Sequence, residues 1–519
     1  MGRITVFSSD GCTYCRQVRA ALAARDIPYT DINISHFPNK RADMLALTDR
    51  YTVPQVFFNE KHIGGADETI QLLSEWDEEL KGGSKTPKDR YVETIESEAG
   101  PYDTRLATPT GPPAIQYMNL TVNRPKEITE VNGKHFTTLQ LMKELIKKMP
   151  RGDLSTFGFG VVYYNSFVGS EAVTALMEIF GIESRDEAIQ LGMKLQRKHF
   201  IEHATKGDHT FGDNRHYFRL HPFNTPSVLN SLRAWTQNSN DEPINVIFLL
   251  SRLWGKLEAL HITAEGLVDH STLRNDDFYW KFEDDVCELQ KVSMKDMDVN
   301  TKTAFLINLY NLMVKYAFVK LGIPSTDLLR LSFYENVCVN IGGTDFSLND
   351  LEHGILRANS RAPYKMLKQF ALGDSARKKL ALEKIDPRIH FALNCGAKGC
   401  PAVKRYTVEA LDEELRLAAM AFCEQETSVS VDEKNNTLGL SKIFNWYMTD
   451  FAGSKNELPS KIVQYLRGEK KEKLERMIQT GKVNVKFLEY DWSTNDCNYL
   501  MFSKSSLKSF PSNMYRIEG

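Results

Sequence analysis

Two cysteines separated by two residues, Cys12 and Cys15, stand between a short β-branched run and a stretch of helical periodicity. Residues 3–7 are typical of a strand, and residues 14–25 carry apolar side chains at the spacing of one helix face. A thiol at the N-terminus of a helix is stabilised as a thiolate by free N–H groups and by the helix dipole. The spacing also lets Cys15 attack a mixed disulfide on Cys12. The pattern predicts a small α/β unit with redox chemistry.

A Cys-x-x-Cys pair can also be half of a zinc site. Such a site needs further ligands, commonly a second pair, and the sequence holds no other Cys-x-x-Cys. Redox use is therefore favoured. A second β-branched and aromatic run at residues 56–58, and Ile70, Leu73 and Trp76 on one helical face, complete an α/β unit over residues 1–80, the head.

The whole chain has 519 residues, enough for about three domains of roughly 150 residues each. Its 42% hydrophobic and 25% charged residues are near the averages of globular proteins, so packed cores are expected throughout. The net charge of -2 offers no overall attraction for nucleic acid, and no such partner is expected. Eight cysteines at irregular spacing are too few for a secreted disulfide framework, which indicates a reducing compartment.

The sequence shows no targeting signal. It begins directly with a strand pattern rather than with a signal peptide, and Val6 breaks the myristoylation pattern. The most apolar long stretch, residues 304–323, is interrupted by two asparagines and two lysines, and no run reaches the roughly 18 uninterrupted apolar residues of a membrane span. A cytoplasmic protein, at most peripheral to a membrane, is expected.

Composition divides the rest of the chain. Residues 81–135 are rich in Gly and Pro with little periodicity, which predicts a linker. Residues 136–222, the middle part, regain helical periodicity, and a polar stretch over 225–243 separates them from residues 244–505, the C-terminal part. The expected fold class is multidomain α/β.

The head resembles a glutaredoxin. Three segments carry the resemblance in order: Cys12-Thr-Tyr-Cys15, Thr-Val-Pro-Gln-Val-Phe-Phe at 52–58, and His-Ile-Gly-Gly-Ala-Asp at 62–67. The resemblance implies a thioredoxin-like fold, a cis peptide bond before Pro54, glutathione as cosubstrate, and glutathionylated or disulfide-bonded proteins as partners. It makes Cys12 and Cys15 catalytic. It assigns glutathione binding to seven residues, Tyr14, Thr52, Val53, Pro54, Gly65, Ala66 and Asp67.

Three residues depart from the usual glutaredoxin pattern. Thr13 replaces a proline, Ser9 stands where many members have lysine, and Ala66 stands where Cys or Ser is common. The missing lysine removes a charge that would stabilise the thiolate and attract glutathione, which affects rate and affinity more than reaction type. Two alternatives stay open: a head that senses redox state without turnover, within a signalling scaffold, and a head that holds an iron–sulfur cluster.

The middle part resembles a DEP domain, named for Dishevelled, Egl-10 and Pleckstrin. The matching stretches are residues 167–176, 188–195, 200–203, 211–213 and 217–220. The resemblance implies a mainly helical, winged-helix-like signalling module that binds a membrane or a receptor and carries no catalysis. Two groups of basic residues, 143–151 and 194–198, are interpreted as solvated helix faces in preference to an anionic-lipid site.

The C-terminal part resembles the domain-of-unknown-function family 547, which implies no established activity, and is expected to be mixed α/β. The resemblance lies in residues 308–311, 352–357, 386–401, 441–447 and 490–492. Residues 389–393 are apolar except for His390, which predicts a buried strand leading into a Gly-rich loop with Cys395 and Cys400. Active sites commonly lie on such loops.

The candidate site of the C-terminal part therefore consists of His353, Arg388, His390, Cys395 and Cys400. One interpretation is a Cys–His nucleophile pair, oriented by Asp386, Glu352 or Asn394. A second is a zinc site formed by both histidines and both cysteines. The third is that both thiols pack as small hydrophobes and His390 hydrogen-bonds inside the core. Arg357 and Arg388 either bind a carboxylate or phosphate or simply pair with Asp386 and Glu352. Glutathione is the one expected cosubstrate, and no resident metal is expected.

Overall fold

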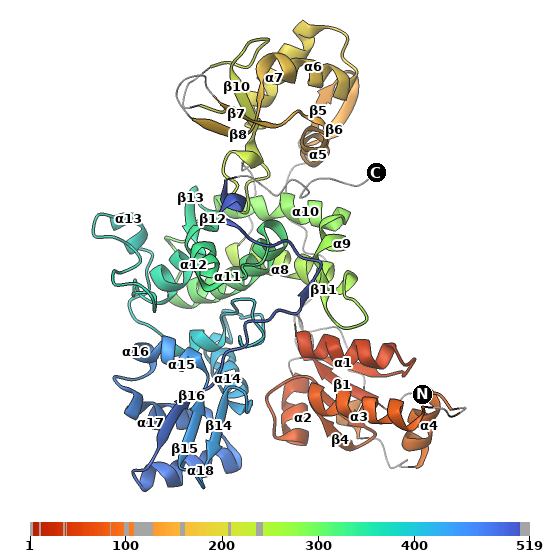
Figure 1. Ribbon diagram of the computed structural model, residues 1–519, viewed down its shortest axis with the longest axis vertical. Helices are drawn as coiled ribbons and strands as arrows, with labels where there is room; N and C mark the ends of the chain where they lie inside the picture. Colours follow the sequence, from red (N-terminus) through yellow and green to blue (C-terminus); the bar gives the residue numbers. More distant parts are fainter. Residues whose placement is uncertain are drawn as a thin grey trace.

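The computed structural model describes residues 4–9, 12–34, 37, 39–81, 83, 85–97, 103–107, 128–155, 161–205, 209–234 and 242–508. The protein is a multidomain α/β protein in which the C-terminal part lies against both the middle part and the head (Figure 1). The middle part, yellow, lies at the top, and the head, red to orange, at the lower right. The C-terminal part, green to blue, connects them and extends to the lower left.

The head is a four-stranded sheet with a hydrophobic core on each face. The strand order is β2-β1-β3-β4, with β1 parallel to β2 and antiparallel to β3. Side chains alternate between the faces, as a pleated strand requires: Val6 and Phe58 pack with α1 and α3, whereas Phe7 and Phe57 pack with α2. The elements are β1 Ile4–Ser8, α1 Thr13–Ala23, β2 Thr30–Asn33, α2 Asn39–Thr48, β3 Gln55–Phe58, β4 Lys61–Gly64 and α3 Ala66–Glu79.

The segment after the head is not the linker that its composition predicts. Helix α4, Pro87–Ser97, buries Tyr91 and Ile95 in one core of the head. Leu106 is buried in the other core, and its carbonyl accepts a hydrogen bond from Thr5 Oγ1 at 3.1 Å. Proline is favoured in the first turn of a helix, so Pro87 starts this helix rather than marking a loop. Residues 98–102 and 108–127 lie outside the described residues.

The middle part combines three helices with a four-stranded antiparallel sheet of order β7-β8-β10-β9. A hairpin, β5-β6, precedes the first helix. The buried residues of the middle part are continuous with the core of the C-terminal part, and Lys143 on α5 pairs with Asp277 at 2.7 Å. The elements are β5 Ile128–Val131, β6 Lys134–Thr137, α5 Thr138–Lys148, β7 Gly152–Ser155, β8 Val162–Val168, α6 Gly169–Phe180, α7 Arg185–Arg197, β9 Ile201–His203 and β10 Tyr217–Leu220.

The C-terminal part is organised around helix α11, Val299–Leu321, which packs on α8. By length and composition α11 could cross a membrane, and it is the one such helix in the described chain; 94% of its apolar window is buried by the rest of the protein. The other helices are α8 Pro243–Leu260, α9 His270–Arg274, α10 Asp277–Asp285, α12 Asp327–Asn336, α13 Ser375–Lys378, α14 Leu411–Glu424, α15 Lys442–Trp446, α16 Met448–Phe451, α17 Leu458–Ile462 and α18 Gly468–Gln479. The strands are β11 Val268–Asp269, β12 Cys338–Ile341, β13 Thr344–Ser347, β14 Val429–Asp432, β15 Thr437–Leu440, β16 Asn484–Phe487 and β17 Asp496–Cys497.

Two expectations for the C-terminal part are corrected. Residues 389–393 are not a strand, because a 3₁₀ helix spans Pro387–Phe391. Asp386 caps this helix by accepting the N–H of Arg388, and Pro387 favours its first turn. The polar stretch after the middle part is also not simply a separator, since residues 228–233 are almost entirely buried and Arg233 is 2% exposed.

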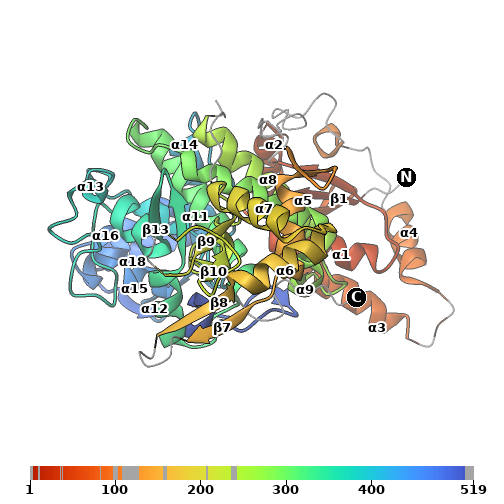
Figure 2. The same cartoon turned by 90° about the horizontal axis from the view of Figure 1, so that it is seen from above.

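The head lies against the C-terminal part. Tyr51 packs with Leu417, Met420 and Ala421 of α14, and its N–H donates to Glu424 at 2.9 Å. In Figure 1, α8 and α11 lie above both the head and the blue helices of the C-terminal part, and α1 is the head helix on the side of α8; Figure 2 shows the same arrangement from above. Arg16 of α1 pairs there with Glu258 of α8, so the start of α1 faces another part of the same chain.

Candidate functional site: two cysteine pairs

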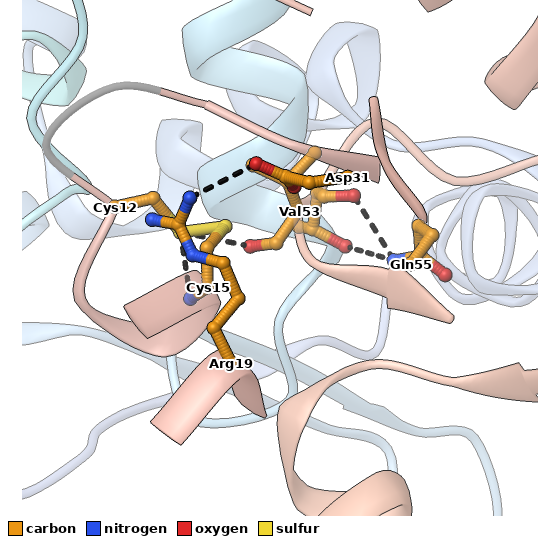
Figure 3. The surroundings of a disulfide bond; sticks show 7 residues. Cys12, Cys15, Arg19, Asp31, Val53 and Gln55 are labelled. Carbon is orange, nitrogen blue, oxygen red and sulfur yellow. Dashed lines mark hydrogen bonds and ion pairs between the residues drawn. A yellow bond between two sulfur atoms is a disulfide. The ribbon is translucent and has the colours of Figure 1, made fainter. Parts of the chain in front are cut away.

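The first pair lies where β1 leads into α1. Cys12 is the N-cap residue of α1, and its sulfur accepts the N–H of Cys15 at 3.1 Å (Figure 3). A disulfide joins Cys12 to Cys15. The same sulfur lies 3.5 Å from the carbonyl oxygen of Val53, and the bond between Val53 and Pro54 is cis. When the pair is reduced, the N–H donor and the helix N-terminus favour a negatively charged sulfur on Cys12.

The residues expected to bind glutathione are brought together around this pair. Val53 lies beside Cys12, and the backbone of Gly65 passes next to the carbonyl of Pro54. Burial raises the pKa of the Tyr14 hydroxyl, and the negative charge of Asp67 raises it further. Thr52 accepts hydrogen bonds from the side chain of Gln55, and Ala66 is buried at the start of α3. Glutathione binding by these residues stays a prediction.

A second carboxylate occupies part of the expected ligand surface. The N–H of Gly65 donates to Glu68 at 3.0 Å, and Arg50 pairs with Glu68 at 3.1 Å. Burial raises the pKa of Glu68, but backbone hydrogen bonds and Arg50 lower it on balance, so the carboxylate is ionised. A glutathione carboxylate at this helix N-terminus would therefore displace Glu68 from Gly65.

Arg16, the residue after Cys15, anchors the head to the C-terminal part. Its guanidinium pairs with Glu258 of α8 at 3.0 Å, and Lys315 of α11 pairs with the same carboxylate at 2.8 Å. Burial alone would raise the pKa of Glu258, but Lys315 and Arg16 hold it at about 2. The carboxylate is thus ionised at neutral pH and links two cations across the contact.

A cavity of about 70 Å³ lies at this contact. Tyr14 and Arg16 line it from the head, and Glu258, Lys315 and Cys400 are among the residues that line it from the C-terminal part. The cavity therefore connects the Cys-x-x-Cys motif with the loop that bears the second cysteine pair. Cys12 and Cys15 are both buried, Cys12 with an exposed fraction of 1%, and the residue between them that lines the cavity is Tyr14.

The second pair, Cys395 and Cys400, lies in an irregular loop after the 3₁₀ helix. The N–H of Cys395 donates to the sulfur of Cys400 at 3.0 Å. The Tyr490 hydroxyl lies 3.0 Å from the sulfur of Cys400 and 3.5 Å from that of Cys395. Hydrogen bonding from Cys400 lowers the pKa of Cys395 to about 7, against the effect of burial, while burial raises the pKa of Cys400. Cys395 is therefore the more readily ionised thiol of the pair.

The two histidines belong to a neighbouring buried polar cluster. His390 Nε2 lies 2.8 Å from Asp450, which also pairs with Arg357 at 2.6 Å. His353 Nδ1 lies 3.0 Å from Arg357. Burial lowers the pKa of His390, and it lowers that of His353 to about 4, so both imidazoles are neutral at pH 7. Neither imidazole hydrogen-bonds to Cys395 or Cys400 in the described part of the chain, so the Cys–His pair is not formed.

Two further expectations concern Arg388 and a zinc site. Arg388 pairs with Asp386 and Asp412, each at 2.7 Å, and so lies apart from the thiols. The four proposed zinc ligands do not converge: among the described residues, the one group of three or more candidate ligands is His203, His209 and His216. That histidine group was missed, because its members are six and seven residues apart in a stretch with no metal-binding spacing.

Three tyrosines and a carboxylate complete the surroundings of the second pair. Tyr334 donates to the carbonyl of Cys395 at 2.6 Å, and Tyr447 donates to Glu352 at 2.6 Å. Hydrogen bonding from Cys400 lowers the pKa of Cys395, and the negative charge of Glu352 opposes this effect. Tyr447 and Tyr490 lie in stretches 441–447 and 490–492, which carry the resemblance to family 547 but for which the sequence predicted no role.

The head is thus a thioredoxin-like dithiol domain, docked on a C-terminal part that carries a second thiol pair. Sequence models of three families match the chain in order: glutaredoxin at residues 4–63, the domain found in Dishevelled, Egl-10 and Pleckstrin at 155–220, and a protein family of unknown function, DUF547, at 294–423. By its N-terminal region the chain belongs to the glutaredoxin family.

Curated relatives match the same N-terminal region. Glutaredoxin 3 of Escherichia coli (strain K12) is 31% identical over 72 residues, which cover 14% of this chain and 87% of that protein. Glutaredoxin 1 of Rickettsia bellii is 31% identical over 76 residues, covering 14% and 78%. Glutaredoxin-C4 of Arabidopsis thaliana is 35% identical over 72 residues, covering 13% and 53%. No solved structure matches the chain. The chain thus contains a thiol oxidoreductase domain and a DEP domain.

Proposed function

We propose that this protein is a glutathione-dependent thiol–disulfide oxidoreductase, coupled to a DEP module and to the C-terminal part. The observation that carries the proposal is the position of Cys12, which caps α1, accepts the N–H of Cys15 and lies beside the Val53 backbone. The relatives named glutaredoxin support the same class of reaction.

In the proposed reaction, the Cys12 thiolate attacks the glutathione sulfur of a mixed disulfide. The protein thiolate leaves and takes a proton, and glutathione remains bound to Cys12 through a disulfide. A second glutathione thiolate then attacks this disulfide, which releases Cys12 and forms glutathione disulfide. Cys15 offers an intramolecular route to the same release, leaving the Cys12–Cys15 disulfide for glutathione to reduce.

Turnover of a glutathionylated peptide by the reduced full-length protein tests the proposal. The assay couples glutathione disulfide formation to NADPH oxidation by glutathione reductase. We expect turnover by the wild type that depends on glutathione. No turnover would leave the alternative, a redox-sensing scaffold without catalysis.

We further place this activity in the cytoplasm, because the chain is poor in cysteine and because buried Cys287 and Cys423 are free thiols. A membrane or receptor remains the proposed partner of the middle part. Lys143 is committed to Asp277 and to the Trp280 ring, at 5.3 Å from the ring centre, so this lysine serves the contact with the C-terminal part.

The pKa of Cys395 favours a second candidate function, a cysteine-nucleophile activity in the C-terminal part. Because the pKa is about 7, the thiolate fraction of Cys395 rises as the pH rises through 7 and falls below it. We expect iodoacetamide to alkylate Cys395 with a midpoint near pH 7, mapped by peptide mass spectrometry. Buried Cys423, whose pKa burial raises, is the control and stays unlabelled. A Cys395 rate that still climbs steeply above pH 8 would contradict the assignment.

A further inference from the structure

We propose that Cys395 and Cys400 form a redox pair that exchanges electrons with Cys12 and Cys15 of the same chain. The inference rests on the proposed function of the head and names a substrate for it within the protein. The observation that carries it is the shared cavity: Tyr14, between the two head cysteines, and Cys400 line the same space at the contact of the two parts.

The positions of Cys395 and Cys400 are those of two thiols that can form a disulfide. The sulfur of Cys400 accepts the N–H of Cys395, and both sulfurs lie within hydrogen-bond reach of the same Tyr490 hydroxyl. Gly396 has a φ of +87°, and a side chain there would collide with Phe318, so this glycine allows the tight loop that returns Cys400 to Cys395. Because the two cysteines lie five residues apart in one loop, a disulfide between them would close within that loop.

The loop that bears the pair is fixed to the segment that faces the head. The N–H of Lys398 donates to the carbonyl of Ser493 at 2.8 Å, and the N–H of Gly399 donates to that of Asp491 at 2.9 Å. Asp491 is close enough to Tyr14 to act electrostatically on its hydroxyl. On the head, Gln17 packs so closely on Gly266 that a Cβ there would lie 2.9 Å from the Gln17 side chain. The Gln17–Gly266 contact thus holds the first turns of α1 against the C-terminal part.

The exchange balances without any further reagent. When the head is reduced and the second pair is oxidised, the Cys12 thiolate attacks the Cys400 sulfur, the Cys395–Cys400 bond breaks, and Cys395 leaves as a thiolate. Cys15 then attacks Cys12, which releases Cys400 and forms the Cys12–Cys15 disulfide. Two electrons and two protons move from the head to the second pair. Two glutathione thiols reduce the head again, and glutathione disulfide drives the sequence in reverse.

The cavity and the chemistry assign different tasks to the two cysteines. Cys400 lines the cavity together with Tyr14 of the head, whereas Cys395 does not, so we assign to Cys400 the attack by Cys12. Cys395, with a pKa of about 7, is the better leaving group and the better resolving nucleophile at neutral pH.

Trapping in the full-length chain tests the exchange. The variant Cys15→Ser with Cys395→Ser keeps only Cys12 and Cys400 of the four, and one equivalent of glutathione disulfide should convert it to a Cys12–Cys400 disulfide within one chain. The matched variant Cys15→Ser with Cys400→Ser should give a Cys12–Cys395 link in at least about tenfold lower yield, a difference of about 1.4 kcal/mol in barrier. Acid quenching, digestion and mass spectrometry identify the links.

Equal yields, no link, or links only between separate chains would overturn the inference. Peptide turnover by the wild type separates this failure from failure of the proposed function, because trapping needs only stoichiometric exchange. If the peptide is reduced and no link forms, the inference alone fails. Glu258→Gln, which removes the carboxylate shared by Arg16 and Lys315, is expected to slow reduction of the second pair about tenfold and to leave peptide turnover unchanged. Equal slowing of both would contradict a role for the contact.

A different observation points to a metal site in the middle part. His203 ends β9, His209 lies in the following loop and His216 precedes β10, and one ligand atom of each lies within 4.8 Å of the other two. The ring centres of His209 and His216 are 4.1 Å apart, and both side chains are exposed. An ion from solvent can therefore reach the group.

The hydrogen bonds of His203 leave one ring nitrogen open. The N–H of Thr205 donates to Nδ1 at 3.2 Å, and the Thr205 hydroxyl lies 2.8 Å from the same atom, whereas Nε2 is buried with no hydrogen-bond partner. Metal binding at Nε2 would move the ring proton to Nδ1, where the carbonyl oxygen of Thr205, 3.1 Å away, can accept it, as in the outer hydrogen bonds of metal-bound imidazoles. We infer that the three histidines bind a divalent transition metal of the Zn²⁺ type, with water in the open position.

Zinc titration of the reduced full-length protein against a chromophoric chelator tests this site. His209→Ala with His216→Ala is expected to lose one equivalent of zinc relative to the wild type. His135→Ala, which removes an exposed histidine of β6, is the matched control and should lose none. The ultraviolet spectrum of bound Co²⁺ distinguishes the two kinds of ligand, because cysteine thiolates give intense charge-transfer bands and histidines do not. An unchanged zinc stoichiometry in the double variant would overturn the site.

Discussion

Cys12→Ser is expected to abolish the reduction of a glutathionylated peptide, with kcat/KM falling more than about 1000-fold, or about 4 kcal/mol in barrier. The serine hydroxyl keeps the N-cap position and can still accept the N–H of Cys15, so α1 should form. It is not ionised at neutral pH and cannot form a disulfide, so the chemical step has no nucleophile. The coupled NADPH assay on the full-length variant measures the loss.

Two other serine variants are the controls for this prediction. Cys15→Ser should retain turnover, because a second glutathione can clear Cys12 without the resolving cysteine. Cys338→Ser removes a half-buried free thiol far along the sequence, and its turnover should match that of the wild type. Full activity in Cys12→Ser together with loss in Cys395→Ser would move the reaction to the C-terminal part and contradict the proposed function.

The head could be predicted from local signals. Alternation in residues 3–7, the spacing of Cys12 and Cys15 and the helical face through Trp76 are each encoded within a few residues. The order of three domains was also predictable, and the family comparisons confirm it. Such signals succeed where the sequence around an element determines its structure.

Helix α4 and the 3₁₀ helix show where local signals fail. Tyr91 and Ile95 are the only buried residues described in α4, and their burial depends on a sheet far back in the sequence. The apolar run at residues 389–393 fits a buried strand and a buried helix equally, and the cap Asp386 with Pro387 decided for the helix. Short apolar runs carry no period long enough to separate the two.

In the candidate site, the cysteines could be predicted from the sequence, but their partners from distant parts of the chain could not. Cys395 and Cys400 were found as neighbours in one loop, but Tyr490, which contacts both, is 95 and 90 residues away. The pair of Arg16 with Glu258 spans 242 residues. Nothing in either local sequence indicates such a partner, so the docking of the head on the second thiol pair required the structure.

Arg233→Met is expected to lower the free energy of unfolding of the C-terminal part by about 3–5 kcal/mol. Arg233 is 2% exposed; it contacts Asp284 at 2.5 Å and Glu288 at 2.6 Å, and both carboxylates are buried. Methionine replaces the volume but not the charge, which leaves two buried carboxylates without their guanidinium. Removing one partner of a buried ionic group costs more than the group contributes, because the remaining charge cannot regain water. A loss of this size is a large share of the roughly 5–15 kcal/mol that stabilises a domain.

Urea unfolding followed by tryptophan fluorescence measures the effect, since Trp254 and Trp280 lie in the core of the C-terminal part. Arg185→Met is the matched control: its partner Asp213 is on the surface, and the urea midpoint should not move. The prediction also distinguishes two views of residues 228–233. If this segment were only a polar separator, Arg233→Met and Arg185→Met would have equal midpoints. A lower midpoint for Arg233→Met alone would establish that the segment belongs to the core on which the middle part and the C-terminal part both depend.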